Sequence, residues 1–330
     1  MKKKVILSGI QATGNLTLGN YIGALKNFAK LQDEYDCYYM IANLHALTVR
    51  RDPEELRTNT LKIIATYIAA GIDPDKSCIF IQSQVPEHSE LTWVLNCYTY
   101  MGELNRMTQF KDKSAKHADN INSGLFTYPV LMASDILLYQ PDLVPTGDDQ
   151  KQHVEITRNI AERFNNLYGK TIEVPNPYIP KIGARIMGLQ DPTSKMSKST
   201  TNPNDSIFLI DTPEEITKKI KKAVTDSEGI VRYDVENKPG ISNLMEIYGI
   251  IEEKSMEDIE KEFEGKNYGI FKQEVANSII RCLEPFHKKY SELMENPEYL
   301  EQICEKGAKK ARTIAGKTLK EVYEKIGIII

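Results

Sequence analysis

Two lysines and two hydroxyl side chains lie together in a strongly polar stretch of the chain. They are Lys195, Lys198, Ser197 and Ser199, and Met196 completes the pentapeptide KMSKS. Ammonium and hydroxyl groups bind phosphate oxygens and stabilise the negative charge that moves when a phosphate reacts. We therefore expect this pentapeptide to close over a polyphosphate. A solvated loop rich in lysine and serine is the alternative interpretation.

A turn near the amino terminus has the composition of a nucleotide-binding turn. Residues 11–20 (QATGNLTLGN) follow a short apolar run and open a helical pattern, which is where open parallel sheets bind nucleotides. Gly19 permits close approach of the backbone, and a helix start presents N–H groups to phosphate. Gln11, Thr13 and Asn20 add neutral donors. Taken alone, a strand-to-helix turn that needs glycine and is capped by asparagine also explains this segment.

An aromatic ring, a thioether and a carboxylate recur at helical spacing. Tyr128, Met132 and Asp135 are four and three residues apart, so a helix that starts at Pro129 places them on roughly one face. Together they predict an apolar slot with a single acceptor. An indole ring, which is large, flat and carries one N–H donor, fits such a slot. An aspartate that caps a helix over core side chains is the structural alternative.

A run of small and acidic residues follows a short apolar segment at residues 143–146. It consists of Gly147, Asp148, Asp149 and Gln150. If the apolar segment is a strand, its carboxyl end brings this run to the nucleotide. The two aspartates also suit the amino-terminal cap of a helix, and both interpretations can hold together.

The elements that position these groups follow from apolar runs and helical periodicity. Four short apolar runs predict buried strands, over residues 5–7, 37–42, 78–81 and 143–146. Asp52 caps a predicted helix that Pro53 opens and Gly71 ends. Strands that alternate with helices at this spacing predict a parallel sheet with crossover helices. Beyond residue 206 the pattern is helical and rich in lysine.

The bulk composition limits the classes of partner. The 330 residues carry a formal net charge of -4, so a polyanion must be held by local basic patches such as residues 218–222 or 306–317. We find no apolar stretch long enough to cross a membrane. The five cysteines form no CxxC pair, which is typical of reduced core thiols in a cytoplasmic protein.

At this point the sequence resembles a known family. Residues 195–199 match the KMSKS signature of the class I aminoacyl-tRNA synthetases, and residues 17–20 (TLGN) look like a variant of that class's HIGH tetrapeptide. Further segments resemble the bacterial tryptophanyl-tRNA synthetases within that class. They are residues 8–11, 19–25, 102–113, 128–138, 147–153 and 223–244.

The sequence departs from the family pattern at positions that are expected near ATP and near the amino acid. Ala12 stands where proline is common, which loosens that turn slightly. Leu7 stands where an aromatic residue is common near the amino-acid pocket. Thr17 and Asn20 replace the two histidines of the HIGH pattern, and they keep hydrogen-bonding capacity without charge.

The resemblance implies an architecture in four parts. It implies an α/β fold with a Rossmann-like parallel sheet, helices on both of its faces, and an α-helical C-terminal domain. The expected regions are a catalytic domain at 1–190 with a helical insertion at about 103–140, a mobile loop at 191–206, an anticodon-binding helical domain at 207–295, and a C-terminal helix at 296–330 that packs back on the catalytic domain.

The activity that the resemblance implies is that of a tryptophan–tRNA ligase. Such an enzyme activates L-tryptophan with ATP to tryptophanyl-adenylate and transfers it to the 3′ end of tRNA(Trp), releasing pyrophosphate and AMP. ATP is then a substrate, Mg²⁺ arrives with its phosphates, and no structural metal is expected. The resemblance also implies a cytoplasmic homodimer.

Site residues are carried over from the family position by position. The catalytic set is Thr17, Asn20, Lys195 and Lys198. The ATP-binding set is Gln11, Ala12, Thr13, Gly19, Asn20, Lys113, Gly147, Asp148, Asp149, Ile186, Lys195, Met196, Ser197, Lys198 and Ser199. The tryptophan-binding set is Leu7, His45, Tyr128, Met132, Asp135, Val144 and Gln150. His45 as a structural residue and Lys113 as an ordinary surface lysine are open alternatives.

Three other functions remain open from the sequence. A tyrosyl-tRNA synthetase shares the fold and the adenylation chemistry, and a carboxylate can accept a phenol proton. A small-molecule nucleotidyltransferase of the same superfamily would lack the KMSKS pentapeptide. A catalytically silent paralogue that only binds RNA would not need Gln11, Asn20, Lys195 and Lys198.

Overall fold

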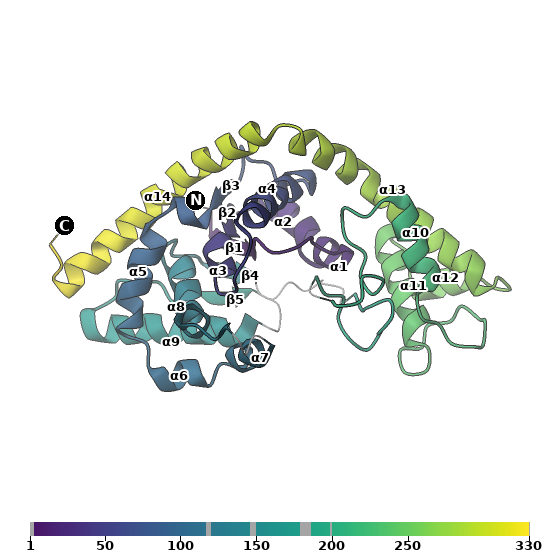
Figure 1. Ribbon diagram of the computed structural model, residues 1–330, viewed down its shortest axis with the longest axis horizontal. Coiled ribbons are helices and arrows are strands. Elements are labelled where there is room, and N and C mark those ends of the chain that lie inside the picture. Colours follow the sequence, from purple (N-terminus) through teal and green to yellow (C-terminus); the bar gives the residue numbers. More distant parts are fainter. Residues whose placement is uncertain (1–2, 117–119, 146–149, 179–185, 199, 330) are drawn as a thin grey trace.

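A five-stranded parallel sheet forms the centre of the computed structural model (Figure 1). The structure describes residues 3–116, 120–145, 150–178, 186–198 and 200–329. The strands are β1 (Val5–Gln11), β2 (Asp36–Ala42), β3 (Cys78–Ile81), β4 (Leu143–Pro145) and β5 (Asn176–Tyr178). Their order is β3-β2-β1-β4-β5, and all pairs are parallel. The predicted parallel α/β architecture is confirmed, whereas β5 (NPY) has no apolar run and is not predicted.

Alternating side chains of the central strands divide the hydrophobic core into two clusters. Leu7 pairs with Tyr38 in the β1–β2 register, and both belong to the cluster on one face. Ile6 and Tyr39 belong to the cluster on the other face. Successive side chains of a strand point to opposite faces, so a sheet covered on both faces needs apolar residues throughout. This is why the strands are visible in the sequence as continuous apolar runs.

One face of the sheet is covered by the helix that follows β1 and by α4. The first helix consists of α1 (Leu18–Asn20), a π-helical turn η1 (Tyr21–Leu25) and α2 (Lys26–Leu31). The second, α4 (Pro53–Ala69), begins as predicted, because the Asp52 carboxylate accepts from the backbone N–H groups of Glu54 and Glu55.

The other face carries most of the remaining helices of the sheet domain. They are α5 (Glu87–Asn96), α6 (Met101–Asn105), α7 (Thr108–Lys116), α8 (Ser123–Leu137) and α9 (Lys151–Tyr168). Two short turns, α3 (Asn43–Ala46) and η2 (Gln82–Gln84), follow β2 and β3 directly. Helix α8 starts before Pro129, since Asn122 caps it by accepting from Leu125 N–H, and the proline lies inside the helix.

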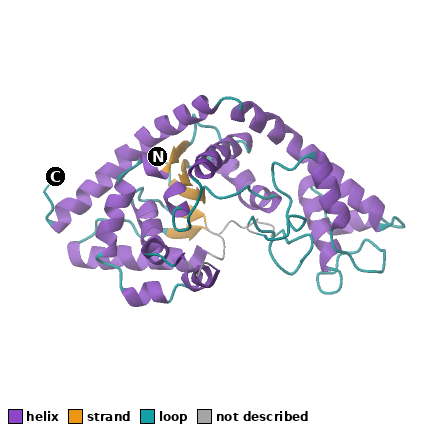
Figure 2. Ribbon diagram, viewed as in Figure 1, coloured by secondary structure: helices purple, strands orange, loops and turns teal. Residues whose placement is uncertain are grey.

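A separate group of helices lies beside the sheet domain, on the right in Figures 1 and 2. It contains α10 (Pro213–Lys222), α11 (Pro239–Glu252), α12 (Met256–Glu262) and α13 (Tyr268–Met294). Helix α13 packs against α10 and α11 and also reaches α4, so it joins this helical domain to the sheet domain. Within the described residues, no helix combines the length and apolar character that crossing a bilayer requires.

The last helix, α14 (Pro297–Ile326), runs back over β3 and α5 (Figure 1). At Gly307 it approaches the edge strand so closely that a Cβ atom would lie 1.9 Å from the carbonyl oxygen of Ile79. Lys306, Lys310 and Arg312 form ion pairs with carboxylates of the sheet domain. These three cations of the predicted basic patch are therefore paired with carboxylates of the protein itself.

All five cysteines are free thiols. Cys37, Cys78 and Cys304 are buried, as expected of core thiols, and burial raises the pKa of Cys78 to about 12. Cys282 is half-buried. Cys97 is exposed, so the expectation of core thiols is wrong there, because this residue ends α5 on the surface.

Candidate functional site

A cavity of about 420 Å³ opens at the carboxyl edge of the sheet. It lies where the strand order reverses, since the chain leads from β1 to β2 on one side, whereas β4 pairs with β1 on the other. Open α/β sheets bind their ligands at such a switch point. Ten of the residues singled out in the sequence line the cavity: Leu7, Gln11, Asn20, His45, Tyr128, Met132, Asp135, Val144, Gln150 and Lys198.

The turn after β1 is organised by a capping box. The Thr17 hydroxyl accepts from Asn20 N–H, and the Asn20 side-chain oxygen accepts from Thr17 N–H. Thr17, and not an asparagine, is therefore the helix cap. The N–H of Leu18 donates to the Ile207 carbonyl. Two of the first three helix amides are thus bonded within the protein, which corrects the expectation of unpaired N–H groups facing phosphate.

Side chains from this turn still reach the cavity. Gln11 lines it and donates from Nε2 to the His45 carbonyl at 2.8 Å. Asn20 lines it beside its capping contacts. Ala12 is fully buried in the core, so its side chain does not face a ligand. The Thr13 hydroxyl accepts a hydrogen bond from Lys198.

Of the two lysines in the pentapeptide, one reaches the turn. Lys198 Nζ donates to Thr13 Oγ1 at 3.0 Å and lines the cavity. Lys195 is exposed and does not line it, and its backbone pairs with Met187 in an isolated bridge. In this arrangement Lys198, and not Lys195, lies at the predicted phosphate seat. Ser199 lies outside the described residues.

Met196 of the pentapeptide packs into the core. Met196 is buried, and its N–H donates to the Ile186 carbonyl at 3.0 Å. A Cβ atom on Gly19 would lie 3.5 Å from Ile186 Cβ and 3.7 Å from Met196 Cβ, so the loop covers the first helix at its glycine. The Ser197 carbonyl accepts from Ser206 Oγ. The polar segment therefore has an apolar anchor that its composition did not predict.

Two side chains that the sequence does not single out fix the base of the loop. Asp205 Oδ1 accepts from the backbone N–H groups of Gln190 and Asp191. Asn243, on α11, accepts from Met187 N–H at 2.9 Å and donates to the Met187 carbonyl at 3.0 Å. The loop is thereby attached to the helical domain by a two-way amide contact.

The three residues from which the sequence predicts an indole slot lie on α8 and line the same cavity. Tyr128, Met132 and Asp135 all line the cavity, together with Leu7 of β1 and Val144 of β4. Leu7 fills part of the slot where the family commonly has an aromatic ring.

The rim of this slot is fixed by hydrogen bonds. The Tyr128 hydroxyl donates to Gln109 Oε1 and lies 2.9 Å from His153 Nε2. Burial raises the pKa of Tyr128, which keeps its hydroxyl protonated. Gln150 lines the cavity from the start of α9.

Asp135 lies at the end of the slot and is almost fully buried. His45 Nε2 donates to its Oδ2 at 2.6 Å, and His88 Nδ1 donates to its Oδ1 at 2.6 Å, because an ionised carboxylate only accepts. Gln82 Nε2 also donates to Oδ1, at 2.7 Å. Burial alone would raise the pKa of Asp135, but the two imidazoles and their hydrogen bonds hold it below its usual range.

The remaining predicted residues cannot be placed. Gly147, Asp148 and Asp149 lie outside the described residues, and so does the side chain of Lys113. Within the described part of the chain, no group of three or more His, Cys, Asp or Glu side chains could hold a metal ion.

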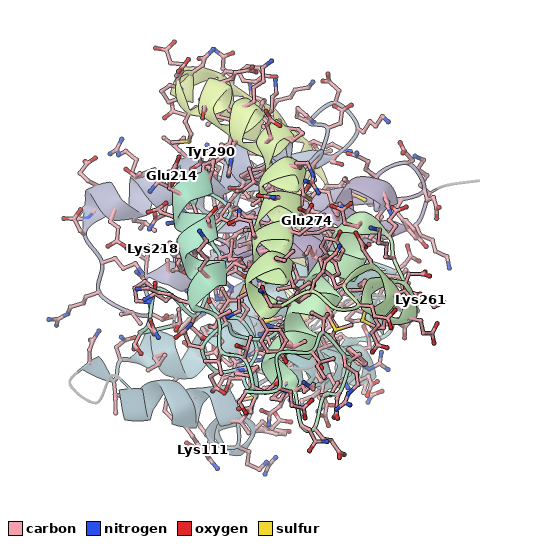
Figure 3. The ribbon with its side chains drawn as sticks, turned by 90° about the vertical axis from the view of Figure 1, so that its right-hand side faces the viewer. Lys111, Glu214, Lys218, Lys261, Glu274 and Tyr290 are labelled. Carbon is pink, nitrogen blue, oxygen red and sulfur yellow. The ribbon has the colours of Figure 1, made fainter. Side chains whose placement is uncertain are left out.

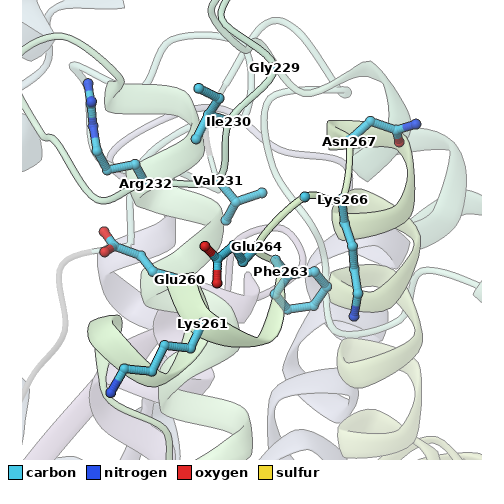
Figure 4. A pocket seen from close by; sticks show the side chains of 11 residues that line it. Gly229, Ile230, Val231, Arg232, Glu260, Lys261, Phe263, Glu264, Lys266 and Asn267 are labelled. Carbon is cyan, nitrogen blue, oxygen red and sulfur yellow. The ribbon is translucent and has the colours of Figure 1, made fainter.

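A second concavity, of about 510 Å³, lies in the helical domain (Figure 4). Glu260 and Glu264 border it together with Arg232, Lys261 and Lys266. Its two carboxylates repel a polyphosphate, and none of the residues that the sequence predicts for the site lines it. We therefore place the chemistry at the sheet edge.

Comparisons with known proteins show the family to which the chain belongs. A family model described as tRNA synthetases class I (W and Y) matches residues 1–284. The chain is 57% identical to the tryptophan–tRNA ligase of Clostridium tetani, over 99% of this chain and 97% of that protein. The chain belongs to the class I tRNA synthetases (W and Y). It is therefore an aminoacyl-tRNA synthetase, a ligase that binds ATP.

Solved structures of the family share the whole fold. The tryptophanyl-tRNA synthetase of Mycoplasma pneumoniae superposes with a TM-score of 0.90 at 36% identity, over 99% of this chain and 98% of that one. The enzyme of Campylobacter jejuni, solved with ADP and tryptophan, gives a TM-score of 0.86 at 38% identity, over 98% and 100%. The similarity includes the sheet domain and the helical domain together.

Proposed function

We propose that this chain is the tryptophan–tRNA ligase of its organism. It activates L-tryptophan with ATP to tryptophanyl-adenylate and transfers the tryptophanyl group to the 3′ end of tRNA(Trp). The observation that carries the proposal is a single cavity with the buried Asp135 acceptor at the end of an apolar slot and the Lys198 ammonium group beside the turn after β1. The identity to curated tryptophan–tRNA ligases supports it.

Amino-acid recognition takes place in the slot on α8. The indole ring lies between Leu7, Met132 and Val144, and its N–H donates to Asp135. Phenylalanine has no ring N–H, so it leaves one acceptor direction of that buried carboxylate unfilled, which costs about 1–3 kcal/mol. The slot therefore selects the substrate by one hydrogen bond and by shape.

Adenylation needs no nucleophile from the protein. The ionised carboxylate of tryptophan attacks the α-phosphorus of ATP, the bond from that phosphorus to the bridging oxygen breaks, and pyrophosphate leaves with its Mg²⁺. Lys198, joined by Lys195 when the loop closes, stabilises the charge that moves onto the leaving group. Gln11 and Asn20 position the nucleotide, and the backbone near Ile186 lies against its base.

Transfer to RNA completes the reaction. A hydroxyl of the 3′-terminal adenosine attacks the carbonyl carbon of the adenylate, and AMP leaves. On the helical domain, Lys218, which Figure 3 labels, is exposed on α10, as are Lys221 and Lys222. Among the described residues, no carboxylate forms an ion pair with any of these three lysines. These lysines supply the local positive charge that the anticodon arm requires.

The active form is a homodimer. The family resemblance supports this assembly, and the largely exposed side chains of Trp93, Tyr100 and Met101 are available for contact with a second copy. Sedimentation equilibrium tests this assembly: a dimer of the 37.5 kDa chain supports it, and a monomer at micromolar concentration contradicts it.

One assay tests the proposed activity. ATP–pyrophosphate exchange is measured with each of the twenty amino acids in turn. Exchange with tryptophan alone is expected. Exchange with tyrosine would assign the chain to the tyrosine branch of the family, and exchange with none would identify a paralogue that does not activate amino acids.

A further inference from the structure

The two carboxylate oxygens of Asp135 have different surroundings. Oδ1 accepts two hydrogen bonds, from Gln82 Nε2 at 2.7 Å and from His88 Nδ1 at 2.6 Å. Gln82 and His88 are fully buried, and neither lines the cavity. Oδ2 accepts from His45, which does line the cavity. One oxygen is thus held from within the protein, and the other is turned toward the ligand.

Counting acceptor directions shows what remains for a ligand. A carboxylate oxygen offers about two lone-pair directions. Gln82 and His88 use both directions of Oδ1. His45 uses one direction of Oδ2, so one direction remains. A ring N–H in the slot can take that direction while His45 keeps its own bond.

Both inner donors are themselves fixed in orientation. Gln82 Oε1 accepts from the Leu44 N–H at 3.0 Å, so its amide nitrogen must face Asp135. On the other side, His88 Nε2 lies 2.8 Å from the Tyr139 hydroxyl, which leaves Nδ1 as the donor to the carboxylate. The donors come from η2 and α5, whereas Asp135 is on α8. Three elements therefore meet at this one oxygen.

We propose that Gln82 and His88 are positioning residues that saturate Oδ1 of Asp135 and so reserve one acceptor direction of Oδ2 for a ring N–H of the amino-acid substrate. This inference rests on the proposed tryptophan-dependent activity. With either donor removed, Oδ1 has a free direction, and the carboxylate can rotate or bind water. The requirement for a ring N–H then weakens, even though neither residue touches the substrate.

The test compares tryptophan with an analogue that lacks the ring N–H. In 3-benzothienyl-L-alanine, sulfur replaces the N–H with little change in shape. The values of kcat/KM in ATP–pyrophosphate exchange are measured for both substrates, and their ratio is the selectivity for the N–H. A hydrogen bond to a charged acceptor predicts a ratio of roughly 10 to 100 for the parent enzyme.

His88→Leu removes the donor at similar volume, and His88→Asn keeps a donor near the position of Nδ1. We expect His88→Leu to reduce the selectivity ratio by about tenfold and to raise the KM for tryptophan, with the KM for ATP unchanged. His88→Asn should restore much of the ratio. Gln82→Leu should act in the same direction as His88→Leu.

Ser134→Ala is the matched control. The Ser134 hydroxyl is buried beside Asp135 and donates to the His88 carbonyl, but it does not touch the carboxylate. Its loss should leave the selectivity ratio unchanged. Tyr139→Phe removes only the hydroxyl beside His88 and provides a mild second variant if His88→Leu does not fold.

The outcomes separate this inference from the proposed function. If Gln82→Leu, His88→Leu and Tyr139→Phe lower kcat/KM equally for both substrates, the residues are merely structural and the inference is overturned. If the parent enzyme uses tryptophan but does not prefer it to the analogue, the inference falls and the ligase activity stands. If the parent enzyme does not activate tryptophan at all, both fall.

Discussion

Replacing Lys198 by alanine should slow adenylation far more than it weakens tryptophan binding. Lys198 Nζ lies 3.0 Å from Thr13 Oγ1 at the edge of the cavity, which is within reach of a phosphate seated at that turn. Loss of one preorganised donor to developing charge lowers kcat by about 10²–10³-fold. Tryptophan binds at the α8 side of the cavity, so its affinity should change by less than about twofold.

Two measurements separate these effects. Single-turnover formation of the adenylate gives the rate of the chemical step, and equilibrium dialysis of labelled tryptophan without ATP gives the affinity. Thr13→Val is a matched variant, because it removes the hydroxyl that accepts from Lys198 but leaves the cation. We expect it to slow the reaction much less than Lys198→Ala does.

Lys195→Ala gives the sharper comparison, since both lysines belong to one pentapeptide. Lys195 is exposed and does not line the cavity in this arrangement. The Lys195→Ala substitution should also lower the rate of adenylation with little loss of tryptophan binding, because closure of the loop brings Lys195 to the leaving group. If Lys198→Ala stays within about twofold of the parent rate, the reasoning from this geometry is refuted.

Three further predictions concern recognition and stability. Asp135→Ala should weaken tryptophan binding by about 1–3 kcal/mol in calorimetry, and equal binding of tryptophan and its ring-N-methylated analogue by the parent enzyme would contradict that role. Gly307→Ala should lower the free energy of unfolding by about 1–3 kcal/mol in urea titrations, because a Cβ atom would lie 1.9 Å from the Ile79 carbonyl oxygen. The control is Gly316→Ala on the same helix, where a Cβ atom meets only an ordinary contact. That substitution should be neutral or stabilising. Burial alone would raise the pKa of Glu103, but Arg163 holds this pKa below its usual 4.5. The stability that this ion pair contributes is therefore present above about pH 4.5 and is lost as the pH falls. A Glu103→Gln variant whose stability depends on acid pH in the same way as the parent's would count against this prediction.

The sheet could be predicted from the sequence because each long strand is buried on both faces. Continuous apolar runs at β1, β2 and β3 follow from that burial. Strand β5 has only three residues and sits at the edge, so no apolar run marks it. The sequence predicts that a helix opens within residues 11–20, with an asparagine as one candidate for its cap. The capping box of Thr17 and Asn20 starts it at Leu18 instead.

The candidate site could be predicted only where its members share an element. Tyr128, Met132 and Asp135 could be grouped because helical spacing brings them to one face. Gln82 and His88 reach Asp135 from 53 and 47 residues away along the chain, and a local pattern cannot show such a contact. Helical spacing therefore predicts the acceptor Asp135 but does not predict its donors Gln82 and His88.

The residues near the slot and the residues of the loop pack in different clusters of the core, and this bears on the proposed reaction. Leu7 and Val144, which line the slot, pack in the cluster with α8 and α9, whereas Ile186 and Met196 at the loop pack in the cluster that extends into the helical domain. In the proposed adenylation, the tryptophan carboxylate is held on the side of one cluster and the α-phosphorus of ATP on the side of the other. Because a reacting pair must approach to about 3–3.5 Å, a small shift between the two clusters changes the rate without altering any substrate contact. Substitutions at their junction, far from both substrates, should therefore affect kcat before either binding constant.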